Sequence, residues 1–119
     1  MKELYLSKNR IQKFELIENS QLQIIDISNN ELLSLPDSIH LAKKLNVLKA
    51  SSNYISEYPI LDITNLEELD LSENQINSIK KIFESKIKSL IILNISFNKI
   101  KSEEIDWSKV RSFPQLRRI

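Results

Sequence analysis

The sequence predicts an α/β repeat protein, in which short strands alternate with helical or extended return segments. Two observations predict it. One pattern of leucine or isoleucine with a late asparagine occurs five times along the 119 residues, at an almost regular interval, and four of the five copies have the full eleven residues. Between two of these copies, residues 76–90 carry apolar side chains at helical spacing, with lysines between them.

The strand of each repeat is predicted by two apolar residues on either side of one variable residue. In the copy LEELDLSENQI these are Leu69 and Leu71, with Asp70 between them. Alternate side chains of a strand point to the same side, so the two leucines face one way and Asp70 faces the other. The five copies span residues 4–11, 22–32, 45–55, 66–76 and 90–100.

A turn must follow each strand, and an asparagine occupies the same place in all five turns. Its side chain has both an acceptor oxygen and an NH2 donor, so a buried asparagine can satisfy backbone groups of its own repeat and of the next one. A leucine there would leave buried amides unpaired, at a cost of about 1–3 kcal/mol each. We therefore expect a structural ladder formed by Asn9, Asn30, Asn53, Asn74 and Asn98, which are 21, 23, 21 and 24 residues apart.

The segments that return the chain to the next strand differ from one another. Residues 33–45 predict a turn at Pro36 followed by an amphipathic run. The inward positions of this run are Ile39, Leu41 and Leu45. Residues 58–66 are shorter and predict an extended or 3-10 path, whereas residues 76–90 predict a helical turn or two. The lysines of the last segment are expected to form a solvated face rather than a phosphate site. They are Lys80, Lys81, Lys86 and Lys88.

The repeated pattern resembles the LxxLxLxxNxL signature of the leucine-rich repeat family, and the resemblance covers nearly the whole chain. It implies a right-handed solenoid with a parallel sheet on the concave face and short helical or 3-10 segments on the convex face. It also implies a single domain over residues 1–119, with about five repeats. Because cysteine-rich caps are absent, the resemblance is to the intracellular type, which implies a cytoplasmic or nuclear location.

The function that this resemblance implies is protein–protein interaction, in which the concave sheet presents a fixed row of side chains to a protein partner of unknown identity. The alternative is a structural segment of a larger leucine-rich repeat protein with no ligand of its own. Such proteins include scaffolds, phosphatase regulators, GTPase regulators and tubulin-folding cofactors.

Both ends of the array are expected to be open. The first repeat begins at Leu4, almost directly on its strand, and the final FPQLRRI places Leu116 and Ile119 where a sixth repeat would open. We therefore expect a partial array whose exposed ends allow self-association. A different expectation is that Trp107 and Phe113 form an improvised cap.

The stretch IDWSKVRSFPQLRRI supports a second resemblance. It is similar to a W-x-x-V…P-x-L pattern found between repeats of tubulin-folding cofactor E-like proteins. The residues that carry this similarity are Trp107, Val110, Pro114 and Leu116. The alternative is that Trp107 and Phe113 simply fill the convex core.

Composition and charge argue against several classes of function. Lys and Arg number 17 and Asp and Glu 16, so the net charge of +1 predicts no nucleic-acid or membrane partner. The chain has no cysteine and no glycine, which excludes disulfides, thiolate metal sites and glycine-rich phosphate loops. No stretch is long enough for a transmembrane helix, and the first ten residues lack the apolar region of a signal peptide.

No cofactor, metal site or enzymatic activity is expected. The turns carry a column of serines, which are Ser7, Ser28, Ser51, Ser72 and Ser96. A nucleophilic serine needs a base within hydrogen-bond reach, but the only histidine, His40, lies in a convex segment. We therefore expect the serines to form local hydrogen bonds with the backbone.

The concave face is where we expect a partner to bind. Asp26, Lys49 and Asp70 should lie side by side at about 4.8 Å per strand, as a charge-neutral ladder or as a row that accepts a basic side chain. Because Lys49 separates the acids, metal binding is not expected. Apolar and aromatic residues on an exposed sheet indicate anchors for a partner. The predicted binding residues are Tyr5, Ile24, Asp26, Val47, Lys49, Asp70, Ile92, Asn94 and Phe97.

Overall fold

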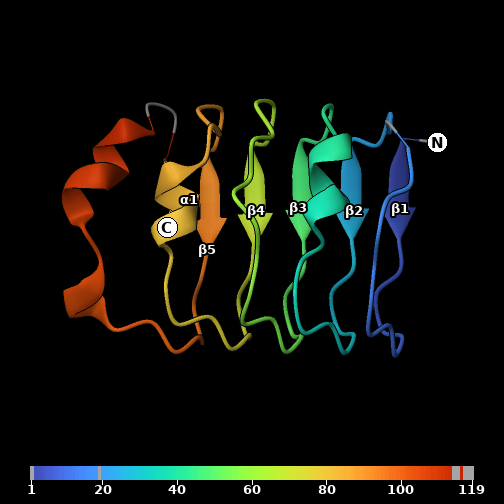
Figure 1. Cartoon of the computed structure of the whole chain (residues 1–119), viewed down its shortest axis with the longest axis horizontal. Helices are drawn as coiled ribbons and strands as arrows, with labels where there is room; N and C mark the ends of the chain where they lie inside the picture. Colours follow the sequence, from blue (N-terminus) through green and yellow to red (C-terminus); the bar gives the residue numbers. More distant parts are fainter. Residues whose placement is uncertain (1, 19, 114–115, 117–119) are drawn as a thin grey trace.

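The computed structural model describes residues 2–18, 20–113 and 116, and it contains one parallel sheet with the strand order β1-β2-β3-β4-β5 (Figure 1). The strands are β1 (Glu3–Tyr5), β2 (Ile24–Asp26), β3 (Val47–Lys49), β4 (Glu68–Asp70) and β5 (Ile92–Asn94). They follow one another along the long axis of the molecule, which measures 37 Å against 25 and 20 Å in the other two directions. One strand per repeat in one sheet confirms the predicted solenoid.

Neighbouring strands pair in a constant register, so equivalent residues of all five repeats form straight rows. The row of central strand residues consists of Leu4, Ile25, Leu48, Leu69 and Leu93. The last four are buried, whereas Leu4 is only partly buried because β1 has a neighbour on one side alone. Since side chains alternate along a strand, the residues on either side of this row point away from the core.

The core lies between the sheet and the return segments. In the view of Figure 1, the 3-10 helix η1 (Asp37–Leu41) and the helix α1 (Lys80–Glu84) lie in front of the sheet. Residues 58–66 contain no helix, in agreement with the extended path predicted for them. The C-terminal segment adds two further 3-10 helices, η2 (Ser102–Glu104) and η3 (Trp107–Ser112).

The 3-10 geometry of η1 corrects one of the three inward positions predicted for residues 33–45. Ile39 and Leu45 are buried as expected, but Leu41 is only partly buried and Ala42 is buried instead. A 3-10 helix has three residues per turn, so side chains three apart lie on one face, and the inward positions become 39, 42 and 45. The prediction for residues 76–90 agrees better with the structure, in which the isoleucines of this segment are buried and its lysines are exposed.

The asparagine side chains connect each repeat to the preceding one, not to the following one as predicted. The amide of Asn53 donates to the carbonyl oxygen of Ile27 at 3.1 Å, and its oxygen accepts the backbone N–H of Leu32 at 3.1 Å. The same amide also donates to two carbonyls of its own turn. Equivalent bonds are made by Asn30, Asn74 and Asn98.

Asn9 does not take the buried, bridging role that the repeat pattern predicts for it. It is exposed, and its amide donates only to the carbonyls of Leu6 and Ser7 in its own turn. The physical reason is its position in the first repeat, where the described chain offers no earlier turn for the side chain to bridge. The predicted ladder is therefore formed by four asparagines that each bridge two repeats, whereas Asn9 bonds only within its own turn.

Each turn between a strand and its asparagine contains one residue in the left-handed region. These residues are Lys8, Asn29, Ser52, Glu73 and Phe97, with φ between 53° and 59°. Glycine or asparagine usually fills such positions, because a Cβ makes this conformation unfavourable by about 1–2 kcal/mol. The chain has no glycine, so the bonds of the asparagines hold four other residue types in this geometry.

The C-terminal segment packs on the last repeat through Phe113. This side chain is buried, and its ring centroid lies 5.8 Å from that of Phe83, which follows from the contact between α1 and η3. Trp107 is 53% exposed, so the expectation that both aromatic residues plug the core is wrong for the tryptophan. The physical reason is that Phe113, directly after η3, takes the buried place against α1, which leaves more than half of the Trp107 side chain in solvent.

The leucines expected at exposed array ends are partly covered. Leu4 and Leu116 are partly buried and pack against the core cluster, so both are less exposed than the open ends predicted. Ile119 and Pro114, on which the remaining predictions for this end depend, lie outside the described residues. Within the described part of the chain, no helix is long and apolar enough to span a membrane.

Candidate functional site

The sheet has one face that the rest of the described chain leaves uncovered, and we call it the concave face. It consists of the outer two residues of every strand: Glu3, Tyr5, Ile24, Asp26, Val47, Lys49, Glu68, Asp70, Ile92 and Asn94. None of these side chains is buried, although the central residue of each inner strand is. Eight of the nine predicted binding residues lie on this face, and the ninth, Phe97, borders it in the turn after β5.

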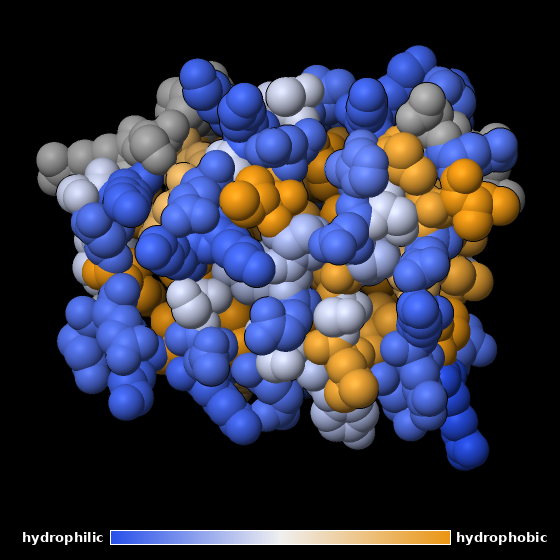
Figure 2. Space-filling view, in the orientation of Figure 1, coloured by the Kyte–Doolittle hydropathy of each residue, from blue (hydrophilic) through white to orange (hydrophobic). Residues whose placement is uncertain are grey.

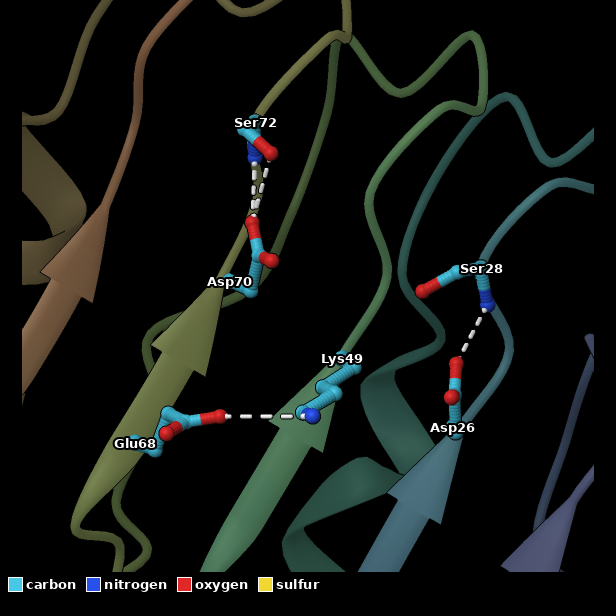
Figure 3. Close-up of polar contacts among 6 residues, drawn as sticks. All are labelled: Asp26, Ser28, Lys49, Glu68, Asp70 and Ser72. Carbon is cyan, nitrogen blue, oxygen red and sulfur yellow. Dashed lines mark hydrogen bonds and ion pairs between the residues drawn. The ribbon is translucent and has the colours of Figure 1, made fainter.

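The centre of the concave face carries its charges, and their pairing differs from the predicted ladder (Figure 3). Asp26, Lys49 and Asp70 are aligned in register, as expected. The ammonium group of Lys49, however, lies 3.8 Å from a carboxylate oxygen of Glu68, in the neighbouring row, and pairs with neither aspartate. Glu68 is not among the predicted binding residues. It lies on the neighbouring strand, two residues before Asp70, which is the register partner of Lys49, and this spacing was the signal that could have indicated the pair.

The two aspartates instead form bonds with their own chain two residues later. One carboxylate oxygen of Asp26 accepts the backbone N–H of Ser28 at 3.0 Å. Asp70 accepts both the backbone N–H and the hydroxyl of Ser72, at 3.0 and 2.7 Å. Asn94 makes the same two bonds with Ser96. All three serines therefore form local bonds through their own backbone N–H groups. The hydroxyls of Ser72 and Ser96 also donate, to side-chain oxygens and not to the backbone oxygens that were expected.

Apolar and aromatic side chains surround this charged centre. Ile24 and Val47 are direct neighbours in the register of β2 and β3, and Ile92 lies in the same row on β5. Tyr5 is 59% exposed at one end of the sheet, and its hydroxyl donates to Glu3 at 2.7 Å. This hydrogen bond to Glu3, together with desolvation and nearby negative charge, raises the pKa of the Tyr5 phenol. Phe97, at the other end, is 79% exposed.

The convex side offers a different surface. In the view of Figure 2 it is mainly hydrophilic, and hydrophobic side chains appear as separate patches. Exposed large hydrophobic residues away from the concave face include Leu33, Tyr54 and Ile60. A cleft of about 220 Å³ lies between α1 and residues 100–109, with Phe83 and Ile105 among its lining residues. Its volume is below the roughly 300 Å³ at which ordinary ligand pockets begin.

The geometry of the titratable groups offers no catalytic arrangement among the described residues. His40 is exposed on η1, where its Nδ1 contacts the carbonyl of Asp37 at 2.6 Å, and the serine column follows the strands. A hydrogen bond from the hydroxyl of Ser108 lowers the pKa of Asp106 in the convex cleft. Asp106 also accepts the backbone N–H of Ser108 and so caps η3. No cluster of three or more potential metal ligands occurs within the part of the chain that the structure describes.

Comparisons with known proteins agree with the repeat seen in the sheet. The family model described as Leucine Rich repeats (2 copies) matches residues 64–109, and the model described as Leucine Rich Repeat matches residues 21–41. No curated protein sequence gives a significant match.

Two solved structures are similar to nearly the whole chain. One is a crystal structure of a TLR13–ssRNA13 complex, with 26% identity and a TM-score of 0.79 over 97% of this chain. The other is an internalin, InlF, from Listeria monocytogenes str. 4b F2365, with 18% identity and a TM-score of 0.58 over 99% of this chain. This chain spans 18% of the first structure and 40% of the second. The family models and the five-stranded solenoid lead to one conclusion: the chain belongs to the leucine-rich repeat family.

Proposed function

We propose that this chain is a protein-binding repeat module that holds its partner against the concave face. The observation that carries the proposal is the uncovered sheet face, on which all ten outward side chains are exposed or partly exposed. Protein-binding surfaces combine apolar and aromatic residues with polar ones. This face contains both kinds, with its charges at the centre and its apolar and aromatic residues around them. The constant strand register fixes the ten positions before binding, which lowers the entropy cost of forming a complex.

The aromatic residues at the two ends of the sheet support this proposal. Tyr5 on β1 and Phe97 after β5 are both largely exposed, and aromatic side chains are enriched among the residues that dominate binding energy. Phe97 also has φ of 56°, an unfavourable conformation for a bulky residue. A large apolar side chain that is exposed and held in a strained turn has no stabilising role in the fold, so a role in binding is the better account.

The charge of the concave face favours a protein partner over a nucleic acid. The similar TLR13 structure is a complex with ssRNA, so an RNA ligand has to be weighed for this chain. Four of the ten side chains on the concave face are carboxylates and one is a lysine, which Glu68 already engages. A phosphate backbone would be repelled by this surface, since RNA binding depends on clustered lysine and arginine.

A structural role within a longer repeat array is the second candidate. It is supported by the two similar structures, of which this chain spans only 18% and 40%. In such an array the ends of this segment would pack on flanking repeats, and the concave face would carry no ligand of its own. The two candidates predict different effects of substitutions on the concave face. Such substitutions abolish binding if the chain is a binding module, and have no ligand to affect if its role is only structural.

The test is a selection of binders from a displayed library of protein fragments of the source organism, with the purified chain as bait. Binders are then measured against a concave variant, Tyr5→Ala/Val47→Ala/Phe97→Ala. The matched control replaces three exposed hydrophobic residues elsewhere, as Tyr54→Ala/Ile60→Ala/Trp107→Ala. We expect the concave variant to lose the binders and the control to keep them, with both variants folded by circular dichroism. Binders retained by the concave variant, or no binders at all, would contradict the proposal.

A further inference from the structure

The concave face carries more negative charge than the chain itself neutralises. Its ten side chains include the carboxylates Glu3, Asp26, Glu68 and Asp70, and a single cation, Lys49. Lys49 lies 3.8 Å from Glu68, so this pair is internally balanced. Neither aspartate forms an ion pair within the described part of the chain. The exposed sheet therefore presents a negative surface to a partner, with apolar residues beside it.

Each aspartate keeps one carboxylate oxygen available. The bonds of Asp26 to Ser28 and of Asp70 to Ser72 all use Oδ1, and no described residue donates to either Oδ2. Figure 3 shows both carboxylates at the carboxyl ends of their strands, on either side of Lys49. Both side chains are partly exposed.

The fold itself does not need a negative charge at these two positions. Asn94 occupies the equivalent place in β5 and makes the same bonds to Ser96 with a neutral amide oxygen. Tyr5 and Lys49 occupy it in β1 and β3, where no such side-chain bond to the serine two residues later is formed. The turns therefore do not require the negative charge of Asp26 and Asp70.

The register sets the distance between the strand positions of the two aspartates. Asp26 and Asp70 lie two strands apart in one row, which corresponds to about 9.6 Å at about 4.8 Å per strand. A polyproline II segment has three residues per turn and rises about 3.1 Å per residue, so its side chains at i and i+3 lie on one side about 9.3 Å apart. An extended β-strand places same-side residues about 6.7 Å apart, which matches this spacing less well.

We propose that the concave face binds an extended, polyproline II-like protein segment whose two lysine or arginine side chains, three residues apart, pair with Asp26 and Asp70. The inference rests on the proposed function and adds the chemistry of the partner. The segment crosses the strands, so that its backbone lies over Lys49 and its apolar side chains contact the Ile24 and Val47 pair. Tyr5 continues the same row beyond Asp26 and offers an aromatic surface of the kind that proline-rich segments pack against.

The test uses a fluorescent synthetic peptide of repeated Arg-Pro-Pro units and measures its binding by anisotropy. Two peptides serve as controls: repeated Glu-Pro-Pro units, and repeated Arg-Pro-Pro-Pro units, which place successive arginines on different sides. We expect the Arg-Pro-Pro peptide to bind most tightly and the Arg-Pro-Pro-Pro peptide to bind more weakly. The Glu-Pro-Pro peptide should not bind. Raising the salt concentration should weaken the binding, because the contacts are exposed ion pairs.

Two double variants separate specific pairing from general attraction. Asp26→Asn/Asp70→Asn removes the charges and keeps oxygens for the turns, as Asn94 does in β5. Asp37→Asn/Asp62→Asn changes the net charge equally at exposed positions in return segments. We expect the first variant to weaken Arg-Pro-Pro binding by about tenfold or more, and the second by less than about twofold. Equal losses in the two variants, or equal affinity for the two arginine peptides, would overturn the proposal.

The fragment selection distinguishes this proposal from the proposed function on which it rests. Binders that depend on the concave face but contain no cationic pair at i and i+3 would overturn the cationic-segment proposal and leave the concave binding site in place. An absence of binders that depend on the concave face would overturn both. Enrichment of such pairs among the binders would support both.

Discussion

The side-chain amide of Asn74 donates to the backbone carbonyl of Ala50, which lies in the preceding repeat, at a distance of 3.0 Å. The same side chain accepts the backbone N–H of Ile55 at 2.9 Å and donates to two carbonyls of its own turn. The side chain of Asn74 thus provides hydrogen-bond partners for backbone groups of two repeats that lie outside the strands and cannot pair within the sheet. This is why the asparagine, and not only the leucines, keeps the same place in each repeat.

Replacing Asn74 by alanine should destabilise the fold far more than the same change at Asn9. Asn74→Ala leaves several buried backbone groups without a partner, at about 1–3 kcal/mol each, so we expect a loss of about 3 kcal/mol or more in unfolding free energy. Asn9 is exposed and bonds only to its own turn, so Asn9→Ala should lose less than about 1 kcal/mol. Urea titrations of the two variants measure the difference, and similar losses would contradict the bridging role.

Replacing Phe97 by asparagine should stabilise the isolated chain. Its φ of 56° disfavours a bulky side chain, whereas asparagine visits this region readily, so we expect a gain of about 1 kcal/mol. The reciprocal change, Asn29→Phe, places a bulky residue at the equivalent position and should lose a similar amount. Thermal or chemical unfolding gives both values. A more stable variant that holds the selected protein fragments less well would support a role of Phe97 in binding and not in stability.

The fold was predictable because its two main signals are local in the sequence. The alternation of leucines indicates a strand, and the return of one asparagine at nearly equal intervals indicates stacking of equivalent turns. The direction of the ladder was not predictable in this way, because an asparagine with free donors and acceptors can bridge to either neighbour. Ala42 was missed for a related reason: the choice between 3-10 and α geometry decides which residue faces inward, and the pattern alone does not fix it.

The composition of the concave face was predictable, but the interactions on it were not. The alternation rule places Asp26, Lys49 and Asp70 in one row, and the strand register agrees. Which acid pairs with Lys49 depends on competing bonds: Ser28 and Ser72 orient the aspartates along their own chains, and Glu68 is left to meet the ammonium group. Such competition between local and cross-strand partners is settled by three-dimensional geometry and not by spacing in the sequence.

The C-terminal segment should depend on Phe113 and not on Trp107. Phe113 is 5% exposed and packs on Phe83, so Phe113→Ala removes a large buried side chain and should lose about 3 kcal/mol or more. Trp107 is more than half exposed, and Trp107→Ala should change stability by less than about 0.5 kcal/mol. Hydrogen exchange should show the Phe113→Ala loss first in α1 and residues 100–110, because a repeat contacts only its neighbours. Equal effects of the two substitutions would contradict this account.

The stability of the fold should fall at alkaline pH because of Tyr58. This residue is buried, and its hydroxyl donates to the carbonyl of Ser78 at 2.7 Å. Burial raises the pKa of the phenol well above its ordinary value of about 10, so the folded state keeps a proton that the unfolded state loses. The stability that the protonated phenol contributes is fully present below about pH 10. It is lost as the pH rises toward the folded-state pKa, by up to about 1.4 kcal/mol per pH unit.

The variant Tyr58→Phe tests this account. It should be less stable than the wild type by about 1 kcal/mol at neutral pH, since the Ser78 carbonyl loses its donor. Its unfolding free energy should nevertheless fall less than that of the wild type above about pH 10. Tyr54→Phe, at an exposed position, is the matched control and should decline like the wild type, as measured by urea unfolding across the alkaline range.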